Sequence, residues 1–303
     1  LYVSANDGLA MVQALPGMYD EPFADSSQIP MALVTKMARQ SVTVALSGDA
    51  GDELFGGYSR YQRAGMWWDR REKTPPFLRS LIAGAARALT PRFSGNKQDK
   101  LQKLNEVLRA ADAVDFYRQF VSYWKDPASV VLGGSEPKTA FSLPAVGSFL
   151  ETAMVIDTVS YLPDDILVKV DRAAMAYSLE TRVPLLDPRV FEFAWGLEDK
   201  YRLRDGENKW ILKQLLHRMV PRHLLDRPKK GFSVPMDEWL RGSLRDWAAG
   251  LLDPVRLREQ GLLDAGLIQQ RWQQHQAGQF DWSKHLWGVL MLQAWMDHHA
   301  IRA

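Results

Sequence analysis

The most constraining feature of this chain is the stretch from Val42 to Tyr58, VTVALSGDAGDELFGGY. Its β-branched and apolar start, VTVAL, predicts a buried strand. The preceding residues 26–40 carry apolar side chains at helical spacing. A helix, a strand and then a glycine-rich loop are typical of an α/β unit with a parallel sheet. The sequence therefore predicts an α/β fold with VTVAL at or near the edge of a parallel sheet.

Most of the remaining chain has helical patterns, so the fold is expected to be predominantly helical. Helices are predicted over 104–124, around 151–162 and over 283–299. Asp187, Asp253 and Asp264 are predicted N-caps, and a proline at the first helical position follows the first two.

Two segments interrupt these patterns. Residues 76–100 begin as a helix and then become basic and loop-like, and 127–147 is rich in glycine, proline and serine. The second segment is the better candidate for a linker or mobile loop. No fixed-period repeat occurs. Residues 1–303 are predicted to form a single domain.

Composition narrows the class of function. The 303 residues are 46% hydrophobic, with no run of about 18 apolar residues that would predict a membrane span. A formal net charge of +2 does not indicate a nucleic-acid or membrane surface. The lack of cysteine removes disulfides and thiol nucleophiles, and it is compatible with a cytoplasmic protein. The start at Leu1, without Met or a signal pattern, suggests a piece of a longer protein.

The acidic loop after VTVAL is the first candidate site. Asp49 and Asp52 are three residues apart, and Gly48 and Gly51 let the backbone approach a ligand closely. Parallel sheets bind ligands at the carboxyl ends of their strands. Two such carboxylates can bind Mg²⁺ with its phosphates, or take a proton from a nucleophile. The alternative is purely structural, with Asp52 and Glu53 capping the next helix.

The second candidate is 161–187, where charged and apolar residues alternate closely. Asp165 and Lys169 are four apart on a predicted helix, and Glu180 and Arg182 are expected near its end. Surface ion pairs worth at most about 0.5 kcal/mol each are the alternative explanation. Charged and apolar residues alternate too closely for all the charges to lie on one solvent-exposed face of a helix. Some of these charges are therefore expected to be buried, and either paired or facing a ligand.

The third candidate is RPKKGFSVP, residues 227–235. Lys229 and Lys230 precede a glycine, and a flexible cationic loop suits a phosphate or pyrophosphate leaving group. By itself this stretch is more typical of a solvated basic loop.

Four segments resemble the synthetase domain of glutamine-hydrolysing asparagine synthetases. They are DEPFADSS (Asp20–Ser27), LSGDAGDELFGGYSRY (Leu46–Tyr61), LPDDILVKVDRAAMAYSLETRVPLLD (Leu162–Asp187) and RPKKGFSVPMDEWLRG (Arg227–Gly242). They occur in that family's order and together span most of the chain. The resemblance implies an adenine-nucleotide α-hydrolase-like domain with a parallel sheet, of which this chain is a predominantly helical fragment.

The resemblance also implies a reaction. ATP activates the side-chain carboxylate of aspartate as an acyl-adenylate with release of pyrophosphate, and ammonia from glutamine then gives asparagine and AMP. ATP and Mg²⁺ are the implied cofactors. The implied partners are aspartate, ATP, ammonia and a covalently linked N-terminal glutaminase domain.

Residue roles follow by matching motifs. Asp49 matches the position of an acidic residue that acts as a base beside the adenylate in the family. Asp52 matches the position of a residue that binds Mg²⁺ and either pyrophosphate or substrate. Lys229 resembles a mobile-loop lysine that stabilises the adenylation transition state, with Lys230 as its nearest rival. The other matched residues are expected to line the substrate and pyrophosphate site, without individual roles: Gly48, Gly51, Glu53, Lys169, Asp171, Arg172, Glu180 and Arg182.

The chain departs from the family pattern in three ways. It contains no S-G-G-x-D-S pyrophosphate loop before DEPF, and no glutaminase cysteine. It is therefore expected to be inactive alone and to expose a sheet edge that favours a homo-oligomer. Many members have Glu at the Asp49 position, so an acceptor other than aspartate, such as a sugar or peptide carboxylate, remains open. A helical scaffold without catalysis is the alternative from another class.

Overall fold

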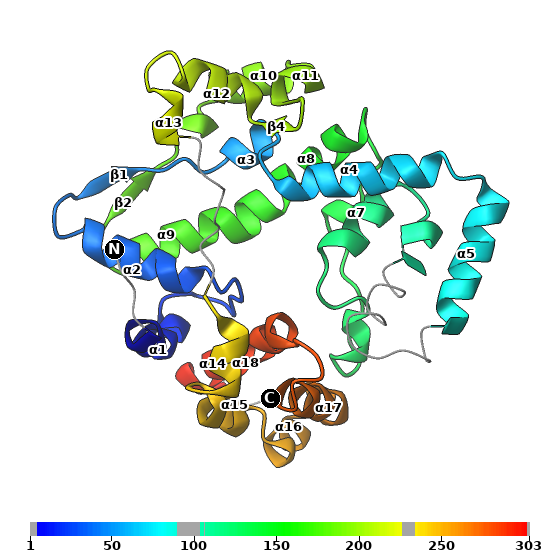
Figure 1. Cartoon of the computed structure of the whole chain (residues 1–303). Helices are drawn as coiled ribbons and strands as arrows, with labels where there is room; N and C mark the ends of the chain where they lie inside the picture. Colours follow the sequence, from blue (N-terminus) through cyan, green and yellow to red (C-terminus); the bar gives the residue numbers. More distant parts are fainter. Residues whose placement is uncertain (1–4, 90–103, 106, 226–233, 302–303) are drawn as a thin grey trace.

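The computed structural model describes residues 5–89, 104–105, 107–225 and 234–301. In this part of the chain, helices dominate and two short two-stranded sheets accompany them (Figure 1). The strands are β1 (Val44–Leu46), β2 (Glu180–Arg182), β3 (Leu203–Arg204) and β4 (Glu207–Asn208). The first helices are α1 (Ala5–Ala14), α2 (Gln28–Ala38), α3 (Gly51–Leu54), α4 (Ser59–Glu72), α5 (Pro76–Leu89), α7 (Ala113–Val121), α8 (Phe149–Val159) and α9 (Val168–Met175).

The second half of the chain is almost entirely helical. Its helices are α10 (Pro188–Trp195), α11 (Asp199–Arg202), α12 (Trp210–Leu216), α13 (Arg222–Leu225), α14 (Met236–Arg241), α15 (Arg245–Leu251), α16 (Pro254–Gln260), α17 (Ala265–Gln276) and α18 (Ser283–His298). Figure 1 shows α14–α18 gathered at the bottom of the view, α10–α13 at the top and the β1–β2 sheet at the left. The predicted helix-rich α/β class is confirmed.

The predicted parallel sheet is confirmed by the pairing of β1 with β2. Val44 lies opposite Glu180 and Leu46 opposite Arg182, in parallel register. The strand is shorter than VTVAL, and it is not buried, since Val44 is 47% and Leu46 74% exposed. The expectation of burial is wrong because, in the described part of the chain, β2 is the only strand that pairs with β1.

The strand β2 replaces the helix end that was expected for Glu180 and Arg182, so that expectation is wrong. The helix α9 ends at Met175, and Ser178 takes a left-handed conformation with φ 58°. Such a residue cannot continue a right-handed helix. The chain turns back here, and the Glu180 amide donates to the Thr43 carbonyl at 2.9 Å, which starts the pairing with β1.

The three predicted helix N-caps are confirmed. The side chains of Asp187, Asp253 and Asp264 each accept a hydrogen bond from a backbone amide in the first turn of the following helix. The predicted helix 104–124 is interrupted, because Asp112 caps a new helix, α7, by accepting from the Asp115 amide. The backbone bends there and presents the Ala110 carbonyl to the buried Arg71 guanidinium.

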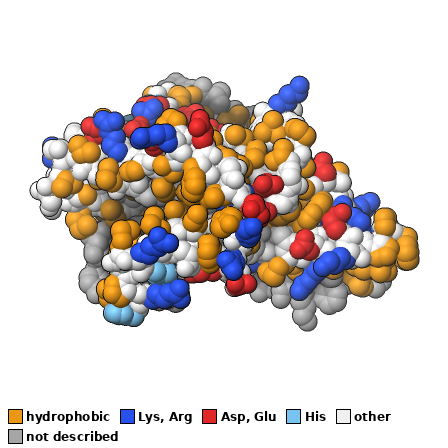
Figure 2. Space-filling view, turned by 90° about the horizontal axis from the view of Figure 1, so that it is seen from above, with side chains coloured by type: hydrophobic (Ala, Val, Ile, Leu, Met, Phe, Trp, Pro, Cys, Tyr) orange, Lys and Arg blue, Asp and Glu red, His pale blue; other side chains and the backbone are white. Residues whose placement is uncertain are grey.

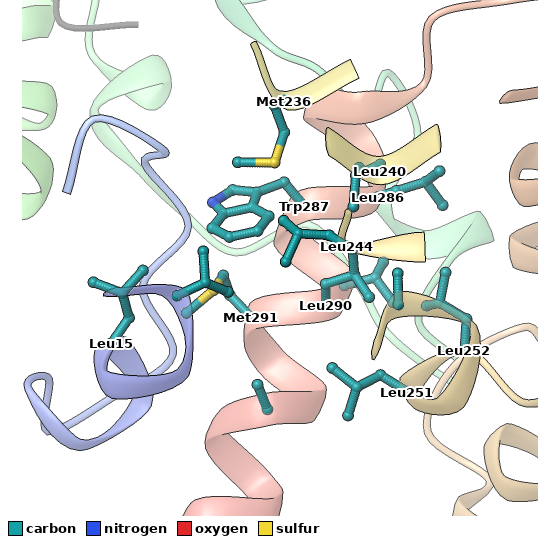
Figure 3. Close-up of a cluster of buried hydrophobic side chains, with 14 of the residues drawn as sticks. Leu15, Met236, Leu240, Leu244, Leu251, Leu252, Leu286, Trp287, Leu290 and Met291 are labelled. Carbon is teal, nitrogen blue, oxygen red and sulfur yellow. The ribbon is translucent and has the colours of Figure 1, made fainter. Parts of the chain in front are cut away.

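The largest core is built around α18, whose predicted burial is confirmed. Trp287, Leu290 and Met291 are at most 2% exposed. Figure 3 shows the Trp287 ring beside Met236 of α14, with leucines of α14 and α15 on the other side of α18. Each large side chain of this kind contributes roughly 1.5–3 kcal/mol on burial, so this core is a major source of the stability of the fold.

The two irregular segments have different outcomes. Residues 127–147 contain the short 3₁₀ turns η3 (Pro127–Ser129) and η4 (Ala140–Ser142) and an isolated β-bridge between Val131 and Leu263. They are anchored there, since the Asp264 amide donates to the Val130 carbonyl at 2.9 Å. Residues 76–89 are helical as predicted, and the basic remainder of 76–100 lies outside the described residues.

Figure 2 shows acidic and basic side chains interspersed with hydrophobic ones over one face of the molecule. Among the described residues, no helix is long and apolar enough to cross a membrane.

Candidate active site

The acidic loop leaves the carboxyl end of β1 in a defined geometry. The Ser47 amide donates to the Arg182 carbonyl at 2.9 Å, which extends the β1–β2 pairing to the start of the loop. Asp49 follows and is half-buried. Ala50 is buried and left-handed with φ 66°, an unfavourable conformation for a residue with a Cβ atom. Backbone strain of this kind is common at functional sites, and here it sets the direction of the turn between the two aspartates.

Asp52 lies in the first turn of α3 and pairs with a lysine that sequence reasoning missed. Its Oδ1 atom is 3.1 Å from the Nζ atom of Lys209. Lys209 is left-handed with φ 51° and precedes α12, directly after the β3–β4 hairpin. That hairpin turns at Asp205 and Gly206, both with positive φ. An Asp-Gly pair is a strong hairpin signal, so the sequence did carry a sign that this region is ordered.

Gly57 makes room for the Asp52–Lys209 pair. A Cβ atom at this position would collide with Asp52 Oδ1 and Lys209 Cε. The Gly57 amide donates to the Asp52 carbonyl at 2.8 Å, and the Asn208 side chain donates to the Gly57 carbonyl at 2.7 Å. The glycine is therefore required by close packing around the ion pair, rather than by a positive φ angle.

We expect Gly57→Ala to separate Asp52 from Lys209 and to lower the free energy of unfolding by about 1–3 kcal/mol, as overpacking does. The matched control is Gly84→Ala in α5, where a new Cβ atom meets nothing within 4 Å. This control should raise the stability by roughly 0.5–1 kcal/mol, because alanine favours a helix over glycine. Urea unfolding of both variants measures the difference, and equal effects at the two positions would contradict the packing argument.

Glu53 is turned into the protein interior. It is 1% exposed, and the Tyr58 hydroxyl donates to its Oε1 atom at 2.5 Å. Burial raises the pKa of Glu53, while the Tyr58 hydrogen bond acts in the opposite direction. The Arg60 guanidinium lies 3.6 Å from the centre of the Tyr58 ring. Glu53 and Tyr58 thus fix the end of α3 from inside, and a role for Glu53 in binding substrate stays a prediction.

Arg60 joins this region to a buried polar network around Asp157 of α8. Asp157 Oδ2 accepts hydrogen bonds from Arg60 at 2.7 Å, Tyr61 at 2.7 Å and Tyr117 at 2.6 Å. Burial raises the pKa of both tyrosine hydroxyls well above the usual value, so they remain protonated donors. The network ties α4, α7 and α8 together behind α3, and no periodic pattern in the sequence indicates it.

The predicted burial of charge in 161–187 is confirmed at Lys169. Its Nζ atom lies 2.5 Å from Asp25 Oδ2 and 3.7 Å from Asp165 Oδ1, and its side chain is 8% exposed. Asp165 belongs to η5 (Leu162–Leu167), a π-helical turn directly before α9. Turns of this type are frequent at functional sites.

The other charged candidates of this segment lie closer to solvent. Arg172 pairs with Asp20 at 2.8 Å, and Asp171 is 60% exposed. Glu180 and Arg182 form an ion pair with each other on β2. The structure therefore brings Arg182 beside the start of the acidic loop, whereas Asp171 and Arg172 lie on α9 near the Asp20–Ser27 segment.

A magnesium ion fits this loop only with help from a substrate. Among the described residues, no cluster of three or more His, Cys, Asp or Glu side chains could hold a metal. Mg²⁺ often uses one or two carboxylates together with water and substrate phosphates, and the partly exposed Asp49 and Asp52 fit that arrangement. Lys229 and Lys230 lie outside the described residues.

The acidic loop leaves the carboxyl end of a strand in a parallel sheet, which is where folds of this class usually bind their ligands. Comparison with known proteins identifies the family. The asparagine synthase family profile matches residues 1–297, so the chain belongs to the asparagine synthase family. It is similar to asparagine synthetase [glutamine-hydrolyzing] 1 of Bacillus subtilis, with 30% identity over 91% of this chain and 44% of that protein.

A second relative is a putative glutamine-hydrolysing asparagine synthetase of Mycobacterium bovis, 32% identical over 99% of this chain and 45% of that protein. An archaeal one, from Methanocaldococcus jannaschii, is 32% identical over 57% of this chain and 34% of its own length. The chain thus spans less than half the length of these curated relatives.

Proposed function

We propose that this chain is part of the centre that makes asparagine from aspartate, ATP and ammonia. The observation that carries the proposal is the acidic loop, in which Asp49 and Asp52 follow β1 and Lys209 lies 3.1 Å from Asp52. In the proposed reaction an aspartate side-chain oxygen attacks the α-phosphorus of ATP and pyrophosphate leaves. Ammonia then attacks the acyl carbon, one proton goes to a base, and AMP leaves with the oxygen it received.

The residues take different parts in this scheme. Asp49, half-buried at the strand end, is the proposed base for the ammonium proton. Asp52 would hold Mg²⁺, which when bound neutralises charge on the phosphates. Lys209 is a proposed second cation for the pyrophosphate, because the Asp52 carboxylate holds its ammonium at the loop. Lys229 remains a proposed mobile-loop cation, with Lys230 as the rival.

The test is pyrophosphate release by the protein with all of its domains, supplied with MgATP and ammonia, with and without aspartate. We expect release to depend on aspartate, because the acyl-adenylate cannot form without the acceptor carboxylate. Ammonia is supplied directly so that the result does not depend on glutamine hydrolysis. If pyrophosphate release depended on a sugar or peptide carboxylate and not on aspartate, that carboxylate would be the acceptor in place of aspartate. No release with any acceptor would favour a non-catalytic scaffold.

A further inference from the structure

Lys169 is enclosed by two carboxylates that come from different parts of the chain. Asp25 belongs to the segment before α2, Asp165 to η5 and Lys169 to α9. The Lys169 ammonium lies 2.5 Å from Asp25 and 3.7 Å from Asp165. Only 8% of the Lys169 side chain is exposed, so its positive charge is balanced by carboxylates of the protein itself. Such a group is better suited to holding elements together than to receiving a substrate.

The cluster has one carboxylate more than its cation can balance. Although burial alone would raise it, the pKa of Asp25 is lowered by the Lys169 ammonium and by hydrogen bonds from Ser27. Burial and the neighbouring Asp25 raise the pKa of Asp165 to about 7. Near neutral pH, Asp25 is therefore ionised and Asp165 is the carboxyl group of the pair that binds a proton.

The surroundings of the cluster supply no second cation in contact with it among the described residues. Tyr19, Tyr123 and Tyr161 face the two aspartates, and burial raises the pKa of each hydroxyl, so all three stay neutral. The positive charge of Arg60 acts in the opposite direction on the pKa of Tyr123 and Tyr161, lowering it. Arg60 is already paired with Asp157 at 2.7 Å.

A mechanical connection leads from this cluster to the acidic loop. Asp25 accepts from the Ser27 hydroxyl at 2.7 Å and from its amide at 2.9 Å, which fastens the carboxylate to the start of α2. The helix α2 packs along α9. Through the turn at Ser178, α9 continues into β2, whose Arg182 carbonyl receives the Ser47 amide at the start of the loop. A shift of α9 relative to α2 would therefore move the acidic loop.

We propose that Lys169, Asp25 and Asp165 form a positioning cluster that holds α9 against α2 and thereby sets the place of the acidic loop. Lys169 is thus a positioning residue, although the family resemblance implies a place for it in the wall of the substrate site. When Asp165 loses its proton, a second, partly buried negative charge faces Asp25 and weakens the contact. The effect on catalysis rests on the proposed function, whereas the effect on stability does not.

The first experiment measures thermal unfolding of the wild-type chain and of Asp165→Asn between pH 5 and pH 8. A group whose folded-state pKa is raised stabilises the fold fully below its unfolded value and loses this contribution as the pH rises through about 7. The wild type should therefore lose stability between pH 5 and pH 8 relative to Asp165→Asn. The exposed Asp246→Asn in α15 is the control and should follow the wild type. Parallel curves for wild type and Asp165→Asn would overturn the proposal.

The second experiment compares Lys169→Arg with Lys169→Met in the protein with all of its domains. A positioning role predicts that arginine, which pairs with two carboxylates, restores most of the kcat that methionine removes, with the KM for ATP and acceptor within twofold of wild type. A tenfold or larger rise in an acceptor KM that arginine does not restore would show contact with substrate and overturn the proposal. If wild type itself is inactive, the proposed function fails, and the unfolding experiment still decides the role of the cluster.

Discussion

Asp52→Asn is expected to lower pyrophosphate release with MgATP, ammonia and aspartate by roughly 100- to 1,000-fold. A metal and its carboxylate are worth several kcal/mol of charge stabilisation in the transition state. Each loss of about 1.4 kcal/mol of such stabilisation lowers the rate roughly tenfold. Asparagine has nearly the same size, but its neutral side chain neither neutralises Mg²⁺ nor holds the Lys209 ammonium, now 3.1 Å away. The loss should therefore fall mainly on the chemical step.

A matched variant separates this effect from a general loss of charge. Asp205→Asn changes an aspartate that is 92% exposed and has φ 50°, a conformation that asparagine adopts readily. It should retain wild-type release within about twofold, since surface changes away from special features have small effects. Unfolding midpoints of both variants show whether the fold is kept. Near-normal release by a folded Asp52→Asn protein would remove Asp52 from the proposed mechanism.

The second large effect is expected on stability, from Asp157→Asn. The Asp157 carboxylate accepts hydrogen bonds from Arg60, Tyr61 and Tyr117 and is 3% exposed. Breaking a buried ion pair by removing one charge costs about 3–5 kcal/mol, because the remaining charge is left uncompensated. Since the Arg60 side chain is 22% exposed and partly hydrated, the lower end, about 3 kcal/mol, is expected in urea unfolding.

Graded variants make this prediction specific to the network. Tyr117→Phe removes the hydroxyl that donates to Asp157 and accepts from Arg60 Nε at 3.0 Å. It leaves the ion pair in place, so it should cost about 1–3 kcal/mol. Asp69→Asn, at an exposed position of α4, is the matched control and should stay within about 0.5 kcal/mol of wild type. If Asp157→Asn were no more destabilising than Asp69→Asn, the network would be dispensable for the fold. It would then also fail as the support of Tyr58 and α3 behind the acidic loop.

Several individual helices and loops could be predicted from signals that are local in the sequence. The caps at Asp187, Asp253 and Asp264 and the buried helix α18 are confirmed, because capping and helical burial depend on residues within one or two turns. The position of the acidic loop after a strand could also be read, since both lie in the single short stretch from Val42 to Tyr58. The family resemblance is confirmed by the profile match over residues 1–297.

Contacts between segments that are distant in the sequence could not be predicted from such local signals. The Glu180–Arg182 pattern is that of a helix end, because its strand character comes from the distant segment Thr43–Ser47 and not from its own residues. Strand propensity is decided largely by such context. The role of Lys209 cannot be predicted from sequence for the same reason, since nothing near it in the chain shows that Gly57 leaves space for it beside Asp52.

By itself, the sequence determined the helix-rich α/β class, the family, and the loop with Asp49 and Asp52, because each rests on short-range patterns or motifs. The tertiary structure alone decided the partners of the charges: Lys209 for Asp52, Asp25 for Lys169, and Arg60 for Asp157. The physical reason is that a charge can be buried only where an opposite charge or a hydrogen-bonding group meets it. In this protein those groups come from segments far apart in the sequence, and only the folded chain brings them together.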